Sequence, residues 1–233
     1  MEQWNETEGT RDNRRYPLLE RVHAGHADLL DVDSGDRVLD IGCGRNPTVD
    51  DAATTVGIDP DPRLVREARQ QVGGGHVCRA SAADLPFVTN AFDAVFMRGV
   101  VHHLGPKSRQ ATFDEVARVL KPTGRIVILE PDPESRFRQV TWAVAGLFGH
   151  EDESEHVDEE GYVTRTQIKS VCTDSGLDVV EQAASGSWLS PLAFVYPSRL
   201  GVGALEQIYD LLTASWWSKT VATPSAHPDR IAE

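Results

Sequence analysis

The chain has 233 residues, which is long enough for one α/β domain with a substantial core, and 40% of them are hydrophobic. Its 36 acidic residues outnumber its 23 basic ones, and the net charge of −13 argues against a nucleic-acid partner. No apolar run reaches the roughly 18 residues of a membrane-spanning helix, and the first residues are polar. We therefore expect no membrane span, no signal peptide and a cytoplasmic location.

Lysine and cysteine are both rare. The four lysines are Lys107, Lys121, Lys169 and Lys219. An acidic chain with so few lysines resembles proteins of salt-loving cells, in which carboxylates keep the surface hydrated. The three cysteines are Cys43, Cys78 and Cys172. Their wide spacing fits a reducing compartment and offers neither a disulfide framework nor a zinc-ligand pair, so we expect no bound metal.

The first predicted element is an amphipathic helix over 13–31, followed by a turn at 33–35. Short apolar runs then alternate with helical patterns. The expected strands are 37–42, 55–59, 76–80, 92–97 and 124–131, and the expected helices are 64–71 and 109–120. Strands that are apolar throughout and separated by helices form parallel sheets covered on both faces. The sequence therefore predicts a doubly wound α/β fold.

The pattern changes after residue 131. The expected elements there are helices at 133–149, 164–176 and 204–217, a strand at 177–183, an apolar segment at 189–196 and a charged loop at 150–161. The loop contains two histidines, but its spacing matches no metal site, so we expect a solvated acidic surface. One domain is predicted over 1–220, with a core at 36–131, a cap at 132–163, a C-terminal part at 164–220 and a mobile tail at 221–233.

The stretch VLDIGCGRNP at 38–47 runs from a strand into Gly42 and Gly44. In doubly wound folds this first turn is rich in glycine, so that a cofactor can lie against bare backbone. Pro47 stands where a dinucleotide motif has its third glycine, which argues against a pyrophosphate-binding oxidoreductase. Asp59 ends the next strand, where a carboxylate either accepts hydrogen bonds from the ribose of a cofactor or caps the helix that follows.

Four stretches in this order resemble the class I S-adenosylmethionine (SAM) dependent methyltransferases, and within them the group related to ubiquinone and menaquinone methyltransferases. The stretches are VLDIGCG, GIDPDP, ADLPFVTNAFDAVFMRGVVHHL and RVLKPTGRIVILEP, which together cover 37–131. The resemblance implies a Rossmann-like, mostly parallel sheet of seven strands with helices on both faces. It also implies SAM as the cofactor and methyl transfer as the activity.

The resemblance assigns roles to residues of the cofactor site. Asp40 would hold the amino group of the methionine part of SAM, and Asp59 the ribose. The other implied cofactor contacts are Gly42, Cys43, Gly44, Pro60, Ser81, Ala82, Asp84 and Met97. Ser81 stands where the family has an acid that binds adenine, and a hydroxyl accepts that bond less strongly than a carboxylate. Asp84 is the alternative adenine contact, and Cys43 is expected to serve packing.

Arg98, His102 and His103 follow the fourth strand and are the candidates for the acceptor side. Methyl transfer requires alignment of the acceptor with the S–CH3 bond, and it requires a base only if the acceptor loses a proton. The histidine pair matches one that is common in the family, and it either supplies that base or binds loop backbone. Arg98 either binds an anionic group of the substrate or pairs with an internal carboxylate.

The residues expected to select the acceptor are Tyr16, Trp142, Leu147 and Phe148, which either roof an apolar pocket or seal the sheet. Trp216 and Trp217 are candidates for a subunit contact, and a monomer or a homodimer is expected.

The leading interpretation is a methyltransferase acting at O, N or C of a small, apolar or aromatic molecule. A nucleic-acid substrate is disfavoured because RGVVHHL differs from the N/D-P-P-Y/F motif of amino-methylating DNA enzymes. The alternatives are a catalytically silent SAM-binding module that regulates a partner, and a nucleotide-dependent oxidoreductase.

Overall fold

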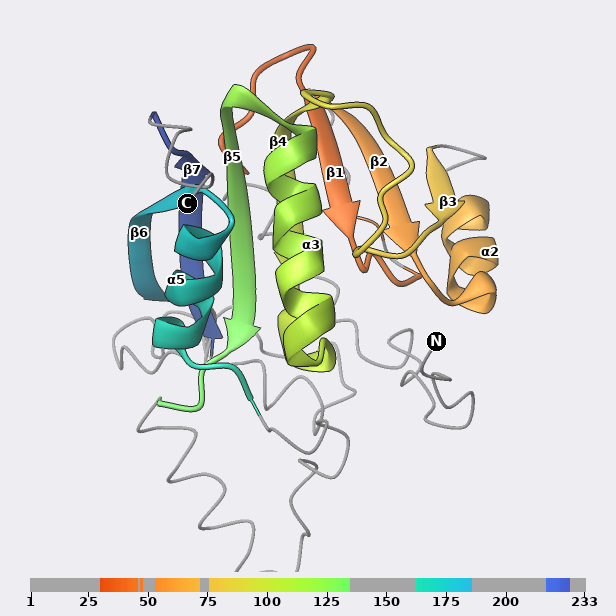
Figure 1. Cartoon of the computed structure of the whole chain (residues 1–233). Helices are drawn as coiled ribbons and strands as arrows, with labels where there is room; N and C mark the ends of the chain where they lie inside the picture. The colour runs from red at the N-terminus through yellow and green to blue at the C-terminus, as the bar shows by residue number, and fades with distance from the viewer. Residues whose placement is uncertain are drawn as a thin grey trace, which may run out of the picture.

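The computed structural model describes residues 30–45, 47, 53–71, 76–134, 162–185 and 217–226. Seven strands form one sheet: β1 (Arg37–Ile41), β2 (Thr54–Asp59), β3 (Val77–Arg79), β4 (Phe92–Arg98), β5 (Leu120–Pro131), β6 (Leu177–Ser185) and β7 (Trp217–Pro224). The helices are α2 (Pro62–Gln71), α3 (Pro106–Val119) and α5 (Arg165–Asp174), with a short 3-10 helix, η3 (Val101–His103). Figure 1 shows α3 and α5 lying across the same face of the sheet.

The strand order is β3-β2-β1-β4-β5-β7-β6. The first five strands run parallel, and β7 runs antiparallel to both β5 and β6. The chain progresses outward from β1 to β3 and then returns to place β4 on the other side of β1. Ligands bind at the carboxyl ends of the strands at such a switch point. The predicted doubly wound, mostly parallel sheet of seven strands is confirmed.

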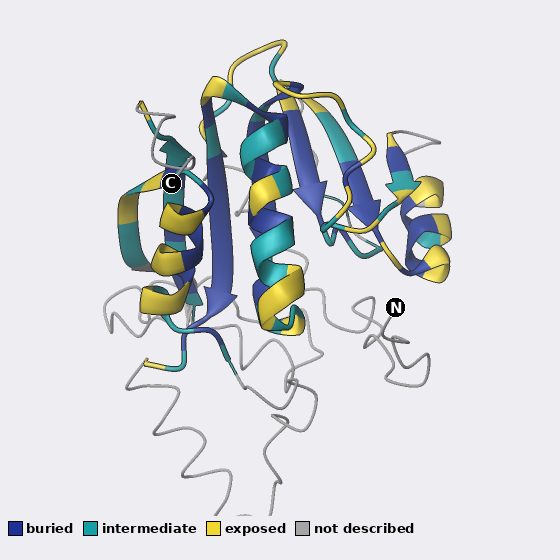
Figure 2. Ribbon diagram, in the orientation of Figure 1, coloured by how far each residue is buried: buried dark blue, intermediate teal, exposed yellow. Residues whose placement is uncertain are grey.

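The two faces of the sheet bury different residues because side chains alternate along a strand. Leu39 and Ile41 of β1 belong to the larger core cluster, which includes Phe113 of α3 and Ile168 of α5. Val38 faces the other side. The second cluster consists of Leu30, Val38, Ala94, Phe96, Val127 and Leu129. Figure 2 shows that β1, β4 and β5 are buried along most of their length, as expected for central parallel strands.

The C-terminal prediction needs a correction. Residue 217 was predicted to end a helix and the mobile tail to begin at 221, but Trp217–Pro224 form β7 between β5 and β6. The buried positions of β7 include Ser218 and Thr220, so the strand lacks the apolar alternation that identifies a strand in sequence. Both hydroxyls are paired inside the sheet. The Ser218 hydroxyl donates to the Glu130 carbonyl (3.4 Å), and the Thr220 hydroxyl accepts from the Gln182 amide (3.1 Å).

Several predicted segments lie outside the described residues. They are most of the helix at 13–31, nearly all of the helix at 133–149, the segment at 189–196 and all but the last residue of the helix at 204–217. Tyr16, Trp142, Leu147, Phe148 and Trp216 lie in these segments. No helix of the described part is both long enough and apolar enough to cross a membrane.

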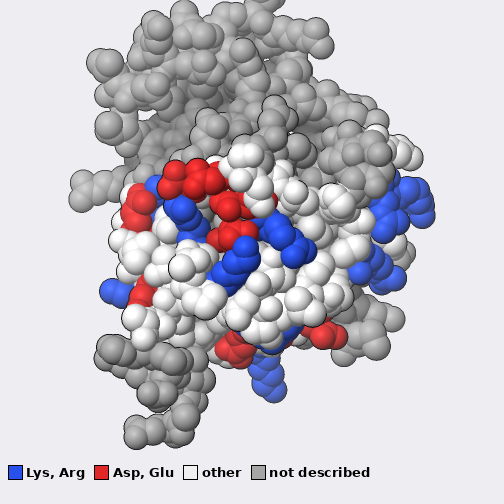
Figure 3. All heavy atoms as spheres, turned by 90° about the horizontal axis from the view of Figure 1, so that it is seen from above, with Lys and Arg blue, Asp and Glu red and all other residues white. Residues whose placement is uncertain are grey.

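Asp93 joins the amino ends of three strands. Its carboxylate accepts hydrogen bonds from the Arg37 backbone N–H (3.0 Å) at the start of β1 and from the Lys121 ammonium (2.7 and 2.8 Å) in β5. Figure 3 looks onto this edge of the sheet and shows acidic and basic side chains side by side in its middle. The edge is therefore held by paired charges.

Candidate cofactor and acceptor site

Gly42 and Gly44 follow β1 at the switch point, and both have positive φ angles, 67° and 59°. They differ in their surroundings. A Cβ atom at Gly42 would lie 2.5 Å from Cγ2 of Val100, so this glycine is required by the protein's own packing. A Cβ atom at Gly44 would meet no atom of the described residues within 4 Å. Of the two glycines of this turn, only Gly44 has backbone that no described residue covers.

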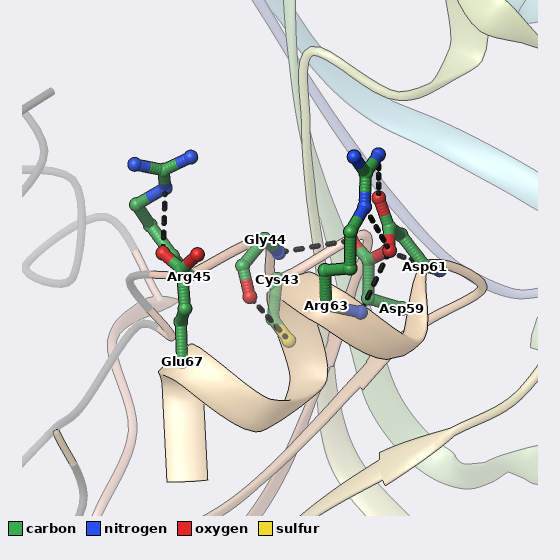
Figure 4. Close-up of polar contacts among 7 residues, drawn as sticks. All are labelled: Cys43, Gly44, Arg45, Asp59, Asp61, Arg63 and Glu67. Carbon is green, nitrogen blue, oxygen red and sulfur yellow. Dashed lines mark hydrogen bonds and ion pairs between the residues drawn. The ribbon is translucent and has the colours of Figure 1, made fainter. Parts of the chain in front are cut away.

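Asp59 faces this glycine turn from the end of β2 (Figure 4). One carboxylate oxygen accepts the Gly44 N–H (3.0 Å), and the other accepts the Asp61 N–H (2.8 Å). Burial raises the pKa of Asp59, and these two hydrogen bonds oppose that rise. The capping role that was one of the two alternatives for Asp59 belongs to Asp61, whose carboxylate accepts the Arg63 N–H (2.7 Å) in the first turn of α2.

Cys43 lies between the two glycines, but its side chain points into the core. It packs against Val65, Ala68 and Val77, and its Sγ lies 3.6 Å from the Gly44 carbonyl oxygen. Burial raises the pKa of Cys43 far above that of an exposed thiol, with the charges of Asp40 and Asp59 acting in the same direction. The side chain is therefore a neutral packing group, and only its main chain can contact a cofactor.

Asp40 and Arg98 lie on neighbouring strands near the same edge. Asp40 is buried in β1 opposite Phe96 of β4, and Arg98 is two residues further along β4. Because every second side chain lies on the same face, Asp40 and Arg98 share a face of the sheet. Met97 lies on the opposite face, where its side chain is fully buried in the larger core cluster. A contact between Met97 and a cofactor is therefore restricted to the main chain.

The predicted adenine loop is a tight turn after β3. Ser81 and Asp84 form an isolated antiparallel bridge, in which the Asp84 N–H donates to the Ser81 carbonyl (3.2 Å). The Ser81 hydroxyl accepts the Ala83 N–H (3.3 Å), and both Ser81 and Asp84 are exposed. Pro60 is exposed on the neighbouring turn, where its carbonyl accepts the Arg79 Nε–H (3.0 Å). Ser81 and Asp84 thus remain alternative adenine contacts.

Two charged residues of α3 hold the chain that follows this loop. The Glu115 carboxylate accepts the Leu85 N–H (2.7 Å). The Arg118 guanidinium donates to the carbonyl oxygens of Leu85 (3.1 Å) and Phe87 (2.7 Å), and it also pairs with Glu115 (2.7 Å). The loop is therefore fixed to a helix of the core rather than left to solvent.

The sequence did not single out Glu130 as a functional residue, yet it organises the acceptor side. Its side chain is fully buried at the end of β5. One carboxylate oxygen accepts the backbone N–H groups of Val100 (2.8 Å) and Val101 (2.6 Å), and the other lies 2.6 Å from Nδ1 of His102. An ionised carboxylate can only accept, which assigns the donor role in this contact to Nδ1 of His102. The one available signal in the sequence was an acid within the apolar run IVILEP.

Aromatic rings surround His102. The ring centroids of His103 and Tyr162 lie 4.0 and 5.9 Å from that of His102. Trp217 of β7 packs nearby, since a Cβ atom at Gly99 would lie 3.6 Å from both the His102 ring and the Trp217 ring. Tyr162 was not predicted, and Trp217 was predicted at a subunit contact. The structure places Trp217 beside the candidate site, and its subunit contact stays a prediction.

A hollow of about 430 Å³ lies beside α2 and β3, and none of the predicted site residues lines it. Its lining consists of Pro62, Val65, Arg66, Arg69, Gln70 and Arg79. Figure 3 shows basic side chains gathered at the right, where α2 and β3 lie in Figure 1. This basic hollow is separate from the glycine turn.

The family model described as "Methyltransferase domain" matches residues 39–128. This match spans β1 to β5 and includes the glycine turn, Asp59 and the histidine pair. Residues 39–128 therefore form a SAM-dependent methyltransferase domain. SAM is accordingly the cofactor of this methyltransferase. The structure fits it, because Gly44 leaves main chain uncovered next to the carboxylate of Asp59.

Curated relatives span several kinds of methyltransferase. An uncharacterized methyltransferase of Synechocystis is 28% identical, covering 70% of this chain and 76% of the relative. A demethylmenaquinone methyltransferase of Tropheryma whipplei is 34% identical, covering 54% of this chain and 56% of the relative. A probable tRNA methyltransferase 9B of mouse is 38% identical, over 43% of this chain and 23% of the relative. The present chain thus covers only 56% of the Tropheryma whipplei relative and 23% of the mouse relative.

One solved structure illustrates the fold. It is a complex between the Haloferax volcanii Trm112 methyltransferase activator and a methyltransferase, with a TM-score of 0.62 and 23% identity. The match covers 92% of this chain and 95% of the other. At this identity the likeness supports the Rossmann-like methyltransferase fold and nothing about the partner.

Proposed function

We propose that this methyltransferase transfers the methyl group of SAM to a small, apolar or aromatic acceptor. The observation that carries the proposal is the set of rings around His102, next to the glycine turn proposed to hold the cofactor. Aromatic rings provide apolar contact area for a flat acceptor. The similarity to a demethylmenaquinone methyltransferase supports the same class of acceptor.

In this proposal the cofactor lies along the main chain of Gly44, and Asp59 accepts hydrogen bonds from its ribose. SAM supplies a methyl group on a sulfonium, which is an electrophile that needs no further activation by the protein. The remaining work of the chain is to hold the acceptor in line and to exclude water. Asp59 is already oriented for its role, because the Gly44 and Asp61 N–H groups fix both of its oxygens.

His102 is the proposed proton acceptor for an acceptor molecule with a hydroxyl group. In the neutral imidazole with its proton on Nδ1 toward Glu130, Nε2 carries the lone pair. The acceptor oxygen would bond to the methyl carbon while the methyl–sulfur electron pair returns to sulfur, and the hydroxyl proton would pass to Nε2. The resulting imidazolium is stabilised by the buried Glu130 carboxylate. Glu130 is thus a positioning residue for His102.

A nucleic-acid acceptor is the competing class, given the similarity to a probable tRNA methyltransferase. The net charge of −13 disfavours it, because phosphate contacts supply most of the affinity for nucleic acid. The test uses tritium-labelled SAM with three fractions of a cell extract: small molecules, RNA and protein. Label in the organic-soluble fraction supports the proposal, and label that ribonuclease releases would overturn it.

The alternative of a catalytically silent SAM-binding module predicts a different combination of results. Such a module would bind S-adenosylhomocysteine in a calorimetric titration but transfer no label to any fraction. Binding of NAD in preference to S-adenosylhomocysteine would instead support the oxidoreductase alternative. A His102→Ala variant that retains cofactor affinity and loses transfer would assign the chemistry to this side of the site.

A further inference from the structure

Arg98 places a positive charge at the proposed cofactor site. The roles proposed for the glycine turn and Asp59 do not account for this charge. Arg98 is the last residue of β4, and its neighbour Gly99 turns the chain with a φ of 62° while donating its N–H to the Leu129 carbonyl (2.8 Å). Its side chain emerges at the carboxyl end of the central strands. This is the edge at which the glycine turn after β1 also lies.

The guanidinium interacts electrostatically with Asp40. Burial lowers the pKa of Arg98, and the charge of Asp40 opposes that change. An arginine side chain stays charged in proteins. Within the described part of the chain, no hydrogen bond or ion pair occupies its five N–H donors. A partly buried guanidinium with open donors is suited to a carboxylate ligand, since it can bind both oxygens at once.

We propose that Arg98 binds the α-carboxylate of the methionine part of SAM. Asp40, on the adjacent strand and the same face, would bind the α-amino group of the same moiety. The negative Asp40 would then face the positive amino group, and the positive Arg98 would face the negative carboxylate. This inference rests on the proposed cofactor site. The Arg98 contact would make this site selective, since cofactor fragments without the carboxylate would lose it.

A calorimetric titration with three probes tests the assignment. S-adenosylhomocysteine carries both the amino and the carboxylate group, its decarboxylated analogue carries only the amino group, and 5′-methylthioadenosine carries neither. The Arg98→Met variant removes the guanidinium and keeps much of the apolar stem. We expect the variant to lose roughly 10-fold to 100-fold in affinity for S-adenosylhomocysteine, as for charged hydrogen bonds elsewhere. Its affinity for the other two probes should change less than about twofold.

Wild-type protein provides a second measurement that needs no variant. It should prefer S-adenosylhomocysteine to the decarboxylated analogue by a similar factor. The matched control is Arg125→Met, at the opposite edge of the sheet, where the guanidinium pairs with exposed Asp31 (2.7 Å). This control should leave all three affinities unchanged. Thermal unfolding of each variant shows whether it is folded.

Three results would overturn the assignment. Equal affinities of wild-type protein for S-adenosylhomocysteine and its decarboxylated analogue would leave no role for a carboxylate contact. Uniform weakening of all three probes in Arg98→Met would make Arg98 a structural partner of Asp40. Unchanged affinities would point Arg98 toward an anionic group of the acceptor. In all three cases the wild-type protein still binds S-adenosylhomocysteine, so the proposed function stands, whereas failure to bind any probe would remove both.

Discussion

The two positions of the turn require glycine for different physical reasons, although the sequence presents them as one motif. Gly42 is enforced by Val100, whereas Gly44 borders open space beside Asp59. A positive φ costs a residue with a Cβ roughly 1 to 2 kcal/mol at either position. Only at Gly42 does the new methyl group also collide with packed protein, which adds about 1 to 3 kcal/mol.

We therefore expect Gly42→Ala to lower the free energy of unfolding by about 2 to 5 kcal/mol and Gly44→Ala by about 1 to 2 kcal/mol. Gly44→Ala should nonetheless abolish most of the affinity for S-adenosylhomocysteine, because its methyl group projects into the proposed path of the cofactor. Urea unfolding and calorimetric titration of both variants give the two quantities. Tight binding by Gly44→Ala would show that the cofactor does not approach this residue.

Asp59 should make cofactor binding depend on pH. In its proposed role the ionised form accepts the ribose hydroxyls, and burial raises the pKa of Asp59 above the ordinary aspartate value of 3.8. Affinity for S-adenosylhomocysteine should therefore be full at neutral pH and begin to fall, on acidification, at a higher pH than for an ordinary aspartate. Asp59→Ala should weaken binding by roughly 2 to 4 kcal/mol at neutral pH and remove this pH dependence. A wild-type affinity that stays constant until the protein unfolds would contradict the prediction.

Glu130 is expected to control the tautomer of His102. In Glu130→Gln the side chain keeps one acceptor oxygen for three N–H donors, so at least one donor loses its partner. An unpaired buried N–H costs about 1 to 3 kcal/mol of unfolding free energy. Nitrogen NMR of the imidazole should show the proton on Nδ1 in wild-type protein and a mixture of tautomers in the variant. The same tautomer in both would make Glu130 a support for the loop backbone only.

At the scale of elements, the sequence predicted the strands that are apolar throughout. β1, β2, β4 and β5 lie close to their expected ranges because central parallel strands are buried on both faces. β7 was missed because Ser218 and Thr220 fill its buried positions. The sequence also did not reveal that Glu130, Tyr162 and Trp217 meet around His102. They come from separate segments, and their spacing along the chain contains no information about that contact.

The Asp93 carboxylate links three strands by hydrogen bonds, and these bonds should weaken in acid. Burial raises its pKa, but the hydrogen bonds from Lys121 and Arg37 outweigh this, so the pKa lies below its usual value. A carboxyl whose pKa is lowered by folding stabilises the fold above its unfolded pKa, and the benefit is lost as pH falls through the folded pKa. Because the pair is partly exposed, Asp93→Asn should cost only about 0.5 to 1 kcal/mol at neutral pH.

The difference between Asp93→Asn and wild-type protein should shrink progressively on acidification below the ordinary aspartate range. Urea unfolding at several pH values measures it. Lys121→Met should cost a similar amount, and the double variant should cost less than the sum, because both changes remove the same contact. Additive costs would show that the ammonium and the carboxylate do not interact in solution.

At the scale of the whole molecule, the charge is unbalanced while the folded core is ordinary. The net charge of −13 makes the compact state repel itself, although local pairs such as Lys121 with Asp93 and Arg118 with Glu115 offset part of this. This net charge already counts the basic side chains at α2 and β3. Salt screens long-range repulsion more effectively than it screens partly buried pairs.

The unfolding temperature should therefore rise with potassium chloride, since screening relieves repulsion that is strongest in the compact state. Most of the rise should come by the concentration at which the screening length falls to roughly 3 Å, near about 1 M salt. Sucrose at matched osmolality is the control, because it favours the compact state without screening charge. A charge-reduced variant with Asp33→Asn and Asp178→Asn, both of which replace exposed carboxylates, should rise less with salt than wild-type protein. If the unfolding temperature falls with salt, the ion pairs stabilise the fold by more than the net repulsion destabilises it. Salt would then not stabilise the protein by screening its acidic charge.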